Sequence, residues 1–112
     1  MDDCIFCKIV AGSVPRSLEY EDDWVVAFKD KNPSAPVHIL IVPKKHLSKL
    51  ADAGAEDKEL LGNLQLAAVA VAKKFGIEDG FRLTTNNGAK VGQAVFHLHY
   101  HLTGGTKEGG DI

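Results

Sequence analysis

The segment "VFHLHYHLTGG", residues 95–105, carries three of the five histidines in this 112-residue chain. His97, His99 and His101 stand at alternate positions, and the residues around them are apolar: Phe96, Leu98, Tyr100 and Leu102. Successive side chains of a strand point to opposite faces. A final strand over residues 93–102 would therefore put the histidines on one face and the apolar side chains in the core.

The spacing of the three histidines argues against one shared metal ion. A strand rises about 3.3 Å per residue, so the backbones of His97 and His101 would lie roughly 13 Å apart. Zinc–nitrogen bonds are only about 2.0–2.1 Å long. Two alternate histidines can chelate one ion, but three along one strand are poorly placed to do so. The three residues should therefore have different roles.

The loop before this strand indicates what one of those roles could be. The glycine-containing stretch "NNGAKVGQ", residues 86–93, can present backbone N–H groups to an anion. A neutral imidazole beside such amides favours phosphoryl chemistry with histidine as the nucleophile. The alternative is an ordinary half-exposed strand face that happens to carry histidines.

The rest of the sequence predicts a single α+β domain over residues 1–112. We expect a five-stranded antiparallel meander sheet with one long helix on one face, a short N-terminal helix and a mobile tail at 105–112. Periodicity and turn residues place a helix at 4–12, two strands within 17–30, a strand at 37–43, the long helix at 55–75 and a strand at 81–86.

Composition limits the classes of partner. The net charge is -2, and no lysine or arginine cluster is longer than a pair, which argues against binding of a nucleic-acid polymer. The start "MDDC" does not resemble a secretory signal, and apolar runs such as 66–72 are shorter than the roughly 20 residues that span a bilayer. We therefore expect a cytoplasmic protein without membrane segments, in which cysteines are thiols or metal ligands.

Several motifs resemble one known family. The stretch "HLHYHLT", 97–103, resembles the H-x-H-x-H-x-x signature of the histidine triad (HIT) family. The stretches "PSAPVHILIVPKKH", 33–46, "TTNNGAKVGQAVFHLHYHLTGG", 84–105, and "CIFCKIVAGSVP", 4–15, resemble its central strand, catalytic loop and N-terminus. Together they cover nearly the whole chain, which is most similar to the Hint branch of nucleoside phosphoramidate hydrolases.

The resemblance implies a covalent mechanism. His99 would attack the α-phosphorus of a nucleoside 5′-phosphoramidate or mixed anhydride, and water would then release the nucleoside monophosphate from a nucleotidyl-histidine. Imidazole has a reference pKa of about 6.5, so much of it is the neutral nucleophile at pH 7. His101 would lie beside the phosphate, and His38 would support the triad from the neighbouring strand. Without the resemblance, a structural role for His38 would be the first choice.

The same resemblance implies a nucleotide site. Asp30 would bind the ribose hydroxyls, with Lys31 beside it. The apolar base pocket would consist of Ile5, Phe6, Ile9, Phe28 and Leu40, and the phosphate would meet Asn86 and the amides of Gly92, Gln93 and Ala94. From sequence alone, the apolar residues would be core residues and Asp30 a turn residue.

The two cysteines form a C-x-x-C pair, Cys4 and Cys7. A thioredoxin-type redox motif would need a preceding strand, but only three residues precede Cys4. Family members with this pair imply one structural zinc per chain, completed by His46 and His97. Four protein ligands leave no open position for catalysis. The alternative is two free thiols and a surface His46.

Two features depart from the Hint branch. Ala94 stands where serine is common, and losing that hydroxyl could cost roughly 1–3 kcal/mol of transition-state binding. The tail "TKEGGDI", 106–112, offers no aromatic or apolar anchor. These departures keep an alternative open, namely a nucleotide-binding or interaction module with zinc and little turnover. In a further alternative, the histidines bind metal alone.

The family also implies a homodimer with a sheet extended across two chains. The long helix carries small residues that would let another helix approach closely: Ala67, Ala68, Ala70 and Ala72. Plain packing of this helix on the sheet explains the same residues equally well.

Overall fold

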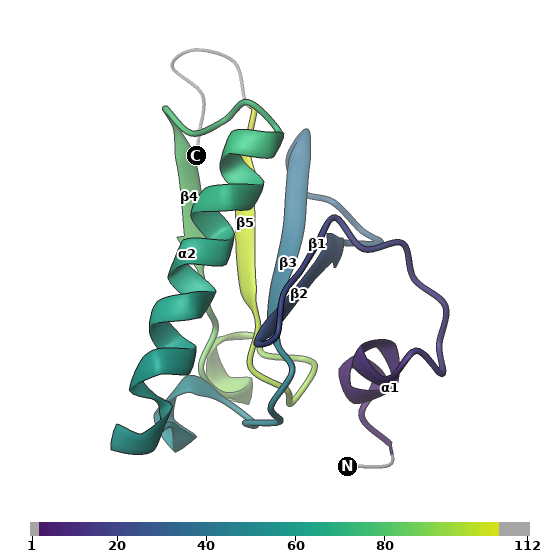
Figure 1. Ribbon diagram of the computed structural model, residues 1–112, viewed down its shortest axis with the longest axis vertical. Helices are drawn as coiled ribbons and strands as arrows, with labels where there is room; N and C mark the ends of the chain where they lie inside the picture. The colour runs from purple at the N-terminus through teal and green to yellow at the C-terminus, as the bar shows by residue number, and fades with distance from the viewer. Residues whose placement is uncertain (1–2, 106–112) are drawn as a thin grey trace.

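The computed structural model describes residues 3–105 and confirms an α+β fold (Figure 1). Its elements are α1 (Ile5–Ala11), β1 (Tyr20–Glu21), β2 (Val25–Lys29), β3 (Val37–Pro43), the 3₁₀ turns η1 (Leu50–Asp52) and η2 (Ala55–Asp57), α2 (Lys58–Lys74), β4 (Phe81–Thr84), η3 (Ala89–Val91) and β5 (Tyr100–Gly104). The expected tail lies outside the described residues from position 106 onward.

The five strands form one sheet in the order β1-β2-β3-β5-β4, with every neighbouring pair antiparallel. This order differs from a simple meander, because β5 lies between β3 and β4. Strands that run parallel need a long crossover, usually a helix. Since α2 connects β3 to β4 and makes them parallel, β5 can fill the space between them antiparallel to both.

The long helix α2 packs on one face of the sheet (Figure 1). Its buried residues recur with helical spacing and include Leu60, Leu64 and Val71. Three of its small residues, Ala67, Ala68 and Ala72, are buried in the same core, so they serve packing on the sheet. The helix ends at Lys74, and Gly76 follows with the left-handed φ of 70° that suits this position.

The opposite face of the sheet packs against α1 and forms a second apolar cluster: Phe6, Ile9, Val26, Phe28, Leu40 and Val42. In the register of the sheet, Phe28 pairs with Leu40, and Leu40 pairs with His101. Because side chains alternate along each strand, these three lie in one row on the α1 face. The two ends of this row belong to β2 and β5.

The last strand begins later than the histidine pattern predicts. Only His101 lies within β5, whereas residues 93–99 are irregular, with a bend at 95–97. Leu98, Tyr100 and Leu102 are buried as expected, but Phe96 is 49% exposed and is not a core residue. The Gln93 side chain and the Leu98 amide donate to the carbonyls of Ser48 and Leu47, so this segment is held by the loop after β3.

No helix within residues 3–105 is both long and apolar enough to cross a membrane.

Candidate active site and metal centre

A cavity of about 420 Å³ lies on the α1 face of the sheet. Twelve of the predicted nucleotide-site residues line it: Ile5, Phe6, Ile9, Phe28, Asp30, Lys31, Leu40, Asn86, Gly92, Ala94, His99 and His101. Arg16, Asn32 and Val95 also line it, although no sequence motif pointed to them. The predicted residues therefore meet around one cavity, whose wall also includes residues that the sequence did not indicate.

His99 has a ring orientation that is fixed by the backbone. Its Nδ1 lies 2.7 Å from the His97 carbonyl oxygen and must donate to it, because a carbonyl only accepts. A neutral ring then carries its lone pair on Nε2. The Thr85 hydroxyl donates to the His99 carbonyl at 2.8 Å and steadies the same residue. His99 therefore offers an unprotonated nitrogen at the cavity wall, as a nucleophile requires.

His38 and His101 form a hydrogen-bonded pair whose direction can be assigned. The Ser34 amide donates to His38 Nδ1 at 3.0 Å, so a neutral His38 carries its proton on Nε2. That nitrogen lies 2.9 Å from His101 Nδ1 and donates to it. His101 consequently carries its own proton on Nε2. The cavity therefore holds one ring with a free lone pair, His99, and one with a free N–H donor, His101.

Asp30 lies beside the hydrogen bond that joins these two rings. Its Oδ2 is 3.4 Å from His38 Nε2 and 4.0 Å from His101 Nδ1, and its Oδ1 accepts the Asn32 amide at 2.8 Å. Burial lowers the pKa of His101, and positive charge on His99 or His38 would lower it further, whereas Asp30 acts in the opposite direction. His101 is therefore neutral near pH 7.

Gln93, in the loop before β5, was expected to hold the phosphate, but the structure gives it another role. Two glycines with left-handed φ values, Gly88 (103°) and Gly92 (96°), shape this loop. The Gln93 amide donates to Gly88 O, and its buried side chain bonds Gly88 N and Ser48 O at 2.8 and 2.7 Å. Gln93 therefore braces the loop and does not line the cavity. The Gly92 amide donates to Ala89 O, so its N–H is also used within the turn.

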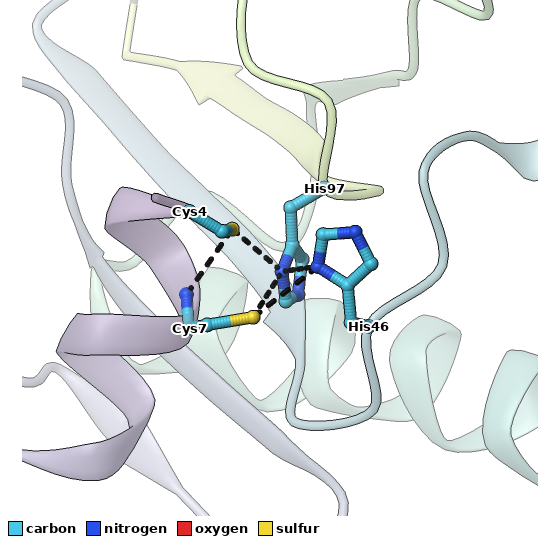
Figure 2. A group of neighbouring side chains, drawn as sticks. All are labelled: Cys4, Cys7, His46 and His97. Atoms are coloured by element: carbon cyan, nitrogen blue, oxygen red, sulfur yellow. Dashed lines mark hydrogen bonds between the residues drawn. The ribbon is translucent and has the colours of Figure 1, made fainter. Parts of the chain in front are cut away.

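A second cluster of side chains lies at the N-terminal end of α1. Figure 2 shows Cys4 and Cys7 from α1 and its N-cap, together with His46 after β3 and His97 before β5. Their ligand atoms all lie within 4.8 Å of one another. The shortest separations are 3.1 Å between the two Nδ1 atoms and 3.2 Å from Cys7 Sγ to His46 Nδ1. The structure thus brings together all four predicted metal ligands.

The arrangement fits a tetrahedral zinc ion. Zn–S and Zn–N bonds of about 2.3 and 2.0–2.1 Å separate the ligand atoms by roughly 3.3–3.8 Å. Cys4 Sγ and Cys7 Sγ lie 3.3 and 3.5 Å from His97 Nδ1. His97 Nε2 donates to Pro43 O at 2.8 Å, which turns the lone pair on Nδ1 toward the thiols. Burial is the largest cause that raises the pKa of Cys7, and the neighbouring Cys4 raises it further. The thiolate forms therefore require a bound cation to stabilise their negative charge.

The Phe6 side chain contacts both the cavity and the cluster of cysteines and histidines. Its ring makes edge contacts with His97 and His99, at centroid distances of 5.9 and 5.1 Å, and with Phe28 at 5.5 Å. The helix that supplies both cysteines therefore also supplies a wall of the cavity.

An ion pair between Lys45 and Asp57 was not anticipated from the sequence. Asp57 is 2% exposed, receives the Gly54 amide at 2.9 Å and pairs with Lys45, the residue before His46. It ties the loop that presents His46 to the beginning of α2. A buried aspartate at a helix start could have been sought as a capping residue, but its lysine partner lies 12 positions away.

Comparisons with known proteins agree with this geometry. The family described as "Scavenger mRNA decapping enzyme C-term binding" matches residues 3–110. An uncharacterised HIT-like protein of Synechocystis is 56% identical over 104 residues, which cover 93% of this chain and 91% of that protein. The chain belongs to the histidine triad family. Protein HitA of Neisseria gonorrhoeae is 49% identical to this HIT protein, over 93% of this chain and 97% of HitA.

Solved structures show the same HIT fold. A HIT family hydrolase from Clostridium thermocellum has a TM-score of 0.93 and 45% identity, covering 100% of this chain and 98% of that one. A histidine triad protein from Clostridium difficile has a TM-score of 0.90 and 45% identity, with 96% and 95% covered. A histidine triad nucleotide-binding protein from Candida albicans has a TM-score of 0.82 and 31% identity, with 89% and 73% covered.

Proposed function

We propose that this HIT protein is a nucleotide-binding hydrolase that cleaves nucleoside 5′-phosphoramidates or related nucleotidyl conjugates. The observation that carries the proposal is that two rings in the cavity differ at Nε2: His99 has a free lone pair there, and His101 has a proton there. The names of solved relatives, a HIT family hydrolase and a nucleotide-binding protein, support the same class of activity.

The residues that line the cavity form three groups, which suit the ribose, the base and the phosphate of a nucleotide. The ribose hydroxyls would meet Asp30, with Lys31 beside it, and the base would lie on the apolar wall formed by Ile5, Phe6, Ile9, Phe28 and Leu40. The phosphate would lie between His99 and His101, near Asn86, Gly92 and Ala94. Gln93 would hold the loop in shape.

The reaction would proceed in two displacements. His99 Nε2 attacks the α-phosphorus, a nitrogen–phosphorus bond forms, and the bond to the leaving amine breaks as that amine takes up a proton from water. His101 donates a hydrogen bond to a phosphate oxygen through Nε2, while His38 and Asp30 hold its orientation. Water then attacks the nucleotidyl-histidine, releases the nucleoside monophosphate with loss of a proton, and restores the neutral ring.

The residues Cys4, Cys7, His46 and His97 would hold one structural zinc ion. A closed four-ligand site contributes folding energy and leaves no position for substrate. In this proposal the metal fixes α1 against the segments after β3 and before β5, and the chemistry belongs to His99.

The proposal includes a cytoplasmic homodimer with an extended sheet. Among residues 3–105, the outer edge of β4 has no partner strand. On α2, Leu66 is 66% exposed and Val69 is 39% exposed. A second copy could pair along β4 and cover both side chains, which size-exclusion chromatography with light scattering would detect.

The deciding experiment combines turnover with trapping of the intermediate. The protein is incubated with adenosine 5′-phosphoramidate, the products are separated by chromatography, and the rapidly quenched enzyme is examined by mass spectrometry. We expect adenosine monophosphate and an adduct of nucleotidyl mass on the peptide that contains His99. Wild-type turnover in His99→Ala would refute the mechanism. Nucleotide binding by calorimetry without any hydrolysis would favour a binding module instead.

A further inference from the structure

Arg16 is an unassigned cation in the wall of the cavity. It lies between α1 and β1, and its guanidinium carbon lies 4.8 Å from the centroid of the Phe28 ring, within cation–π range. Its Nη2 donates to the Lys29 carbonyl at 2.6 Å. Within residues 3–105 it forms no ion pair with a carboxylate, so its other N–H groups are not committed to a charged partner.

The sheet places Arg16 at one end of the cavity and the reactive histidines at the other. His101, Leu40 and Phe28 form a row across β5, β3 and β2, and strands lie about 4.8 Å apart, so the row is about 10 Å long. The Ala27 carbonyl accepts the Glu19 amide on the β1 side of β2, and the Lys29 carbonyl points to the same side. Arg16 therefore reaches Phe28 from the β1 edge, beyond the end of this row.

This placement determines which part of a nucleotide Arg16 would meet. In the function proposed above, on which this inference rests, the phosphate lies beside His99 and His101 and the ribose beside Asp30. The base then extends toward Phe28, with its far edge toward Arg16. The distance from His101 makes Arg16 a poor ligand for the phosphate of the same nucleotide.

The chemistry of the guanidinium then selects among bases. Arginine has five N–H donors and no acceptor, so the base edge that faces it must present acceptors. Guanine offers O6 and N7 on one edge, and hypoxanthine offers the same pair, whereas adenine replaces O6 with an amino donor. We propose that Arg16 forms a base-edge subsite that makes this protein favour 6-oxopurine nucleotides, those of guanine and hypoxanthine, over adenine nucleotides.

The test compares binding of GMP, IMP and AMP by calorimetry. We expect the wild type to bind GMP and IMP about fivefold to tenfold more tightly than AMP, the lower end for a bidentate arginine contact because Arg16 is partly exposed. Arg16→Met keeps a long unbranched side chain over Phe28 but removes the donors, so all three affinities should become equal within about twofold. Arg82→Met, the same change at an exposed site on β4, should keep the wild-type preference.

Two further measurements separate base recognition from simple charge attraction. Guanosine and adenosine, which lack the phosphate, should show the same preference in the wild type. Arg16→Lys keeps the charge but lacks the planar pair of donors, and it should lose most of the preference. If Arg16→Met weakened GMP, IMP and AMP by the same factor, Arg16 would act only as a charge and the subsite would be refuted.

The outcomes distinguish this inference from the function on which it rests. If the wild type binds and hydrolyses the conjugates of AMP and GMP equally well, the base-edge subsite is refuted and the hydrolase stands. If no nucleotide binds at millimolar concentration, both proposals are refuted.

Discussion

His97 and His99 are two residues apart, yet the structure gives them opposite tautomers. Each ring donates one N–H to a backbone carbonyl, but His97 uses Nε2, toward Pro43 O, and His99 uses Nδ1, toward His97 O. The lone pair is therefore on Nδ1 in His97 and on Nε2 in His99. The residue type is the same, and the position of the carbonyl decides which ring atom is free to react.

The two rings also differ in how buried they are and in which side chains surround them. His97 is 0% exposed and faces Cys4, Cys7 and His46, while burial, the largest cause, lowers its pKa and favours the neutral ligand. His99 is partly exposed and lines an open cavity. The first environment suits a closed structural site, and the second gives a substrate access to the ring. Two experiments test this division directly, and two more test the cavity around His99.

The strongest test removes the reactive ring. We expect His99→Ala to lower turnover of a nucleoside phosphoramidate by at least about 1,000-fold, because the nucleophile is lost. Zinc content should remain that of the wild type, since His99 is not one of the four clustered ligands. Steady-state kinetics and elemental analysis of the same preparation check both. Loss of zinc together with activity would contradict the division.

The reciprocal test removes one of the four proposed zinc ligands without removing a helix cap. Cys4 Sγ accepts the Cys7 amide at the N-cap of α1, and serine is a preferred residue there, so Cys4→Ser keeps the cap and loses the thiolate. We expect loss of bound zinc and about 2–4 kcal/mol of unfolding free energy. Urea denaturation with and without a chelator measures this. A chelator that destabilises Cys4→Ser as strongly as the wild type would contradict the assignment.

A smaller effect is expected on the phosphate side of the cavity. Ala94 lines the cavity without a polar side chain, so Ala94→Ser would restore a hydroxyl near the transferred phosphate. One added hydrogen bond of about 1 kcal/mol corresponds to roughly a fivefold gain in kcat/KM. Kinetics with two amine leaving groups would show whether the gain depends on the leaving group. Ala89→Ser, at an exposed position in η3, is the matched control.

The smallest effect concerns pH. Burial and the neighbouring histidines lower the pKa of His101 below its usual value of about 6.5, so the unfolded chain binds more protons than the folded one in that range. Its contribution to stability is therefore present above about pH 6.5 and is lost as the pH falls through the folded pKa. Acidification from pH 7.5 to 5.5 should destabilise the wild type more than His101→Gln. Urea denaturation at both pH values measures the difference, and equal losses would contradict it.

The sequence predicted the elements whose signals are local. The apolar spacing of Leu60, Leu64 and Val71 and the lysines at the end of α2 are enough to place the long helix. The run at 37–43 is β3, the strand that carries His38 and Leu40. The family motifs contain the four clustered cysteines and histidines and most of the residues that line the cavity, because those residues occur at recognisable spacing.

The errors have a physical cause in contacts between distant residues. Alternation of histidine with apolar residues has the period of a strand, but the Leu98 amide donates to the Leu47 carbonyl and residues 93–99 do not pair within the sheet. The same holds for Gln93, whose side chain bonds Ser48. Arg16 could not be found from sequence either, because its place depends on a carbonyl 13 residues away. No periodicity encodes such contacts.

The short helix α1 has a consequence for how the two sites communicate. Seven residues are too few for a helix to persist in water alone, so α1 is ordered by what it packs against and binds. Its detachment would withdraw Cys4 and Cys7 from the proposed metal site and Phe6 and Ile9 from the cavity in one local unfolding step. A metal and a nucleotide that both require the attached helix would then share its ordering cost, and each would tighten binding of the other by the same factor.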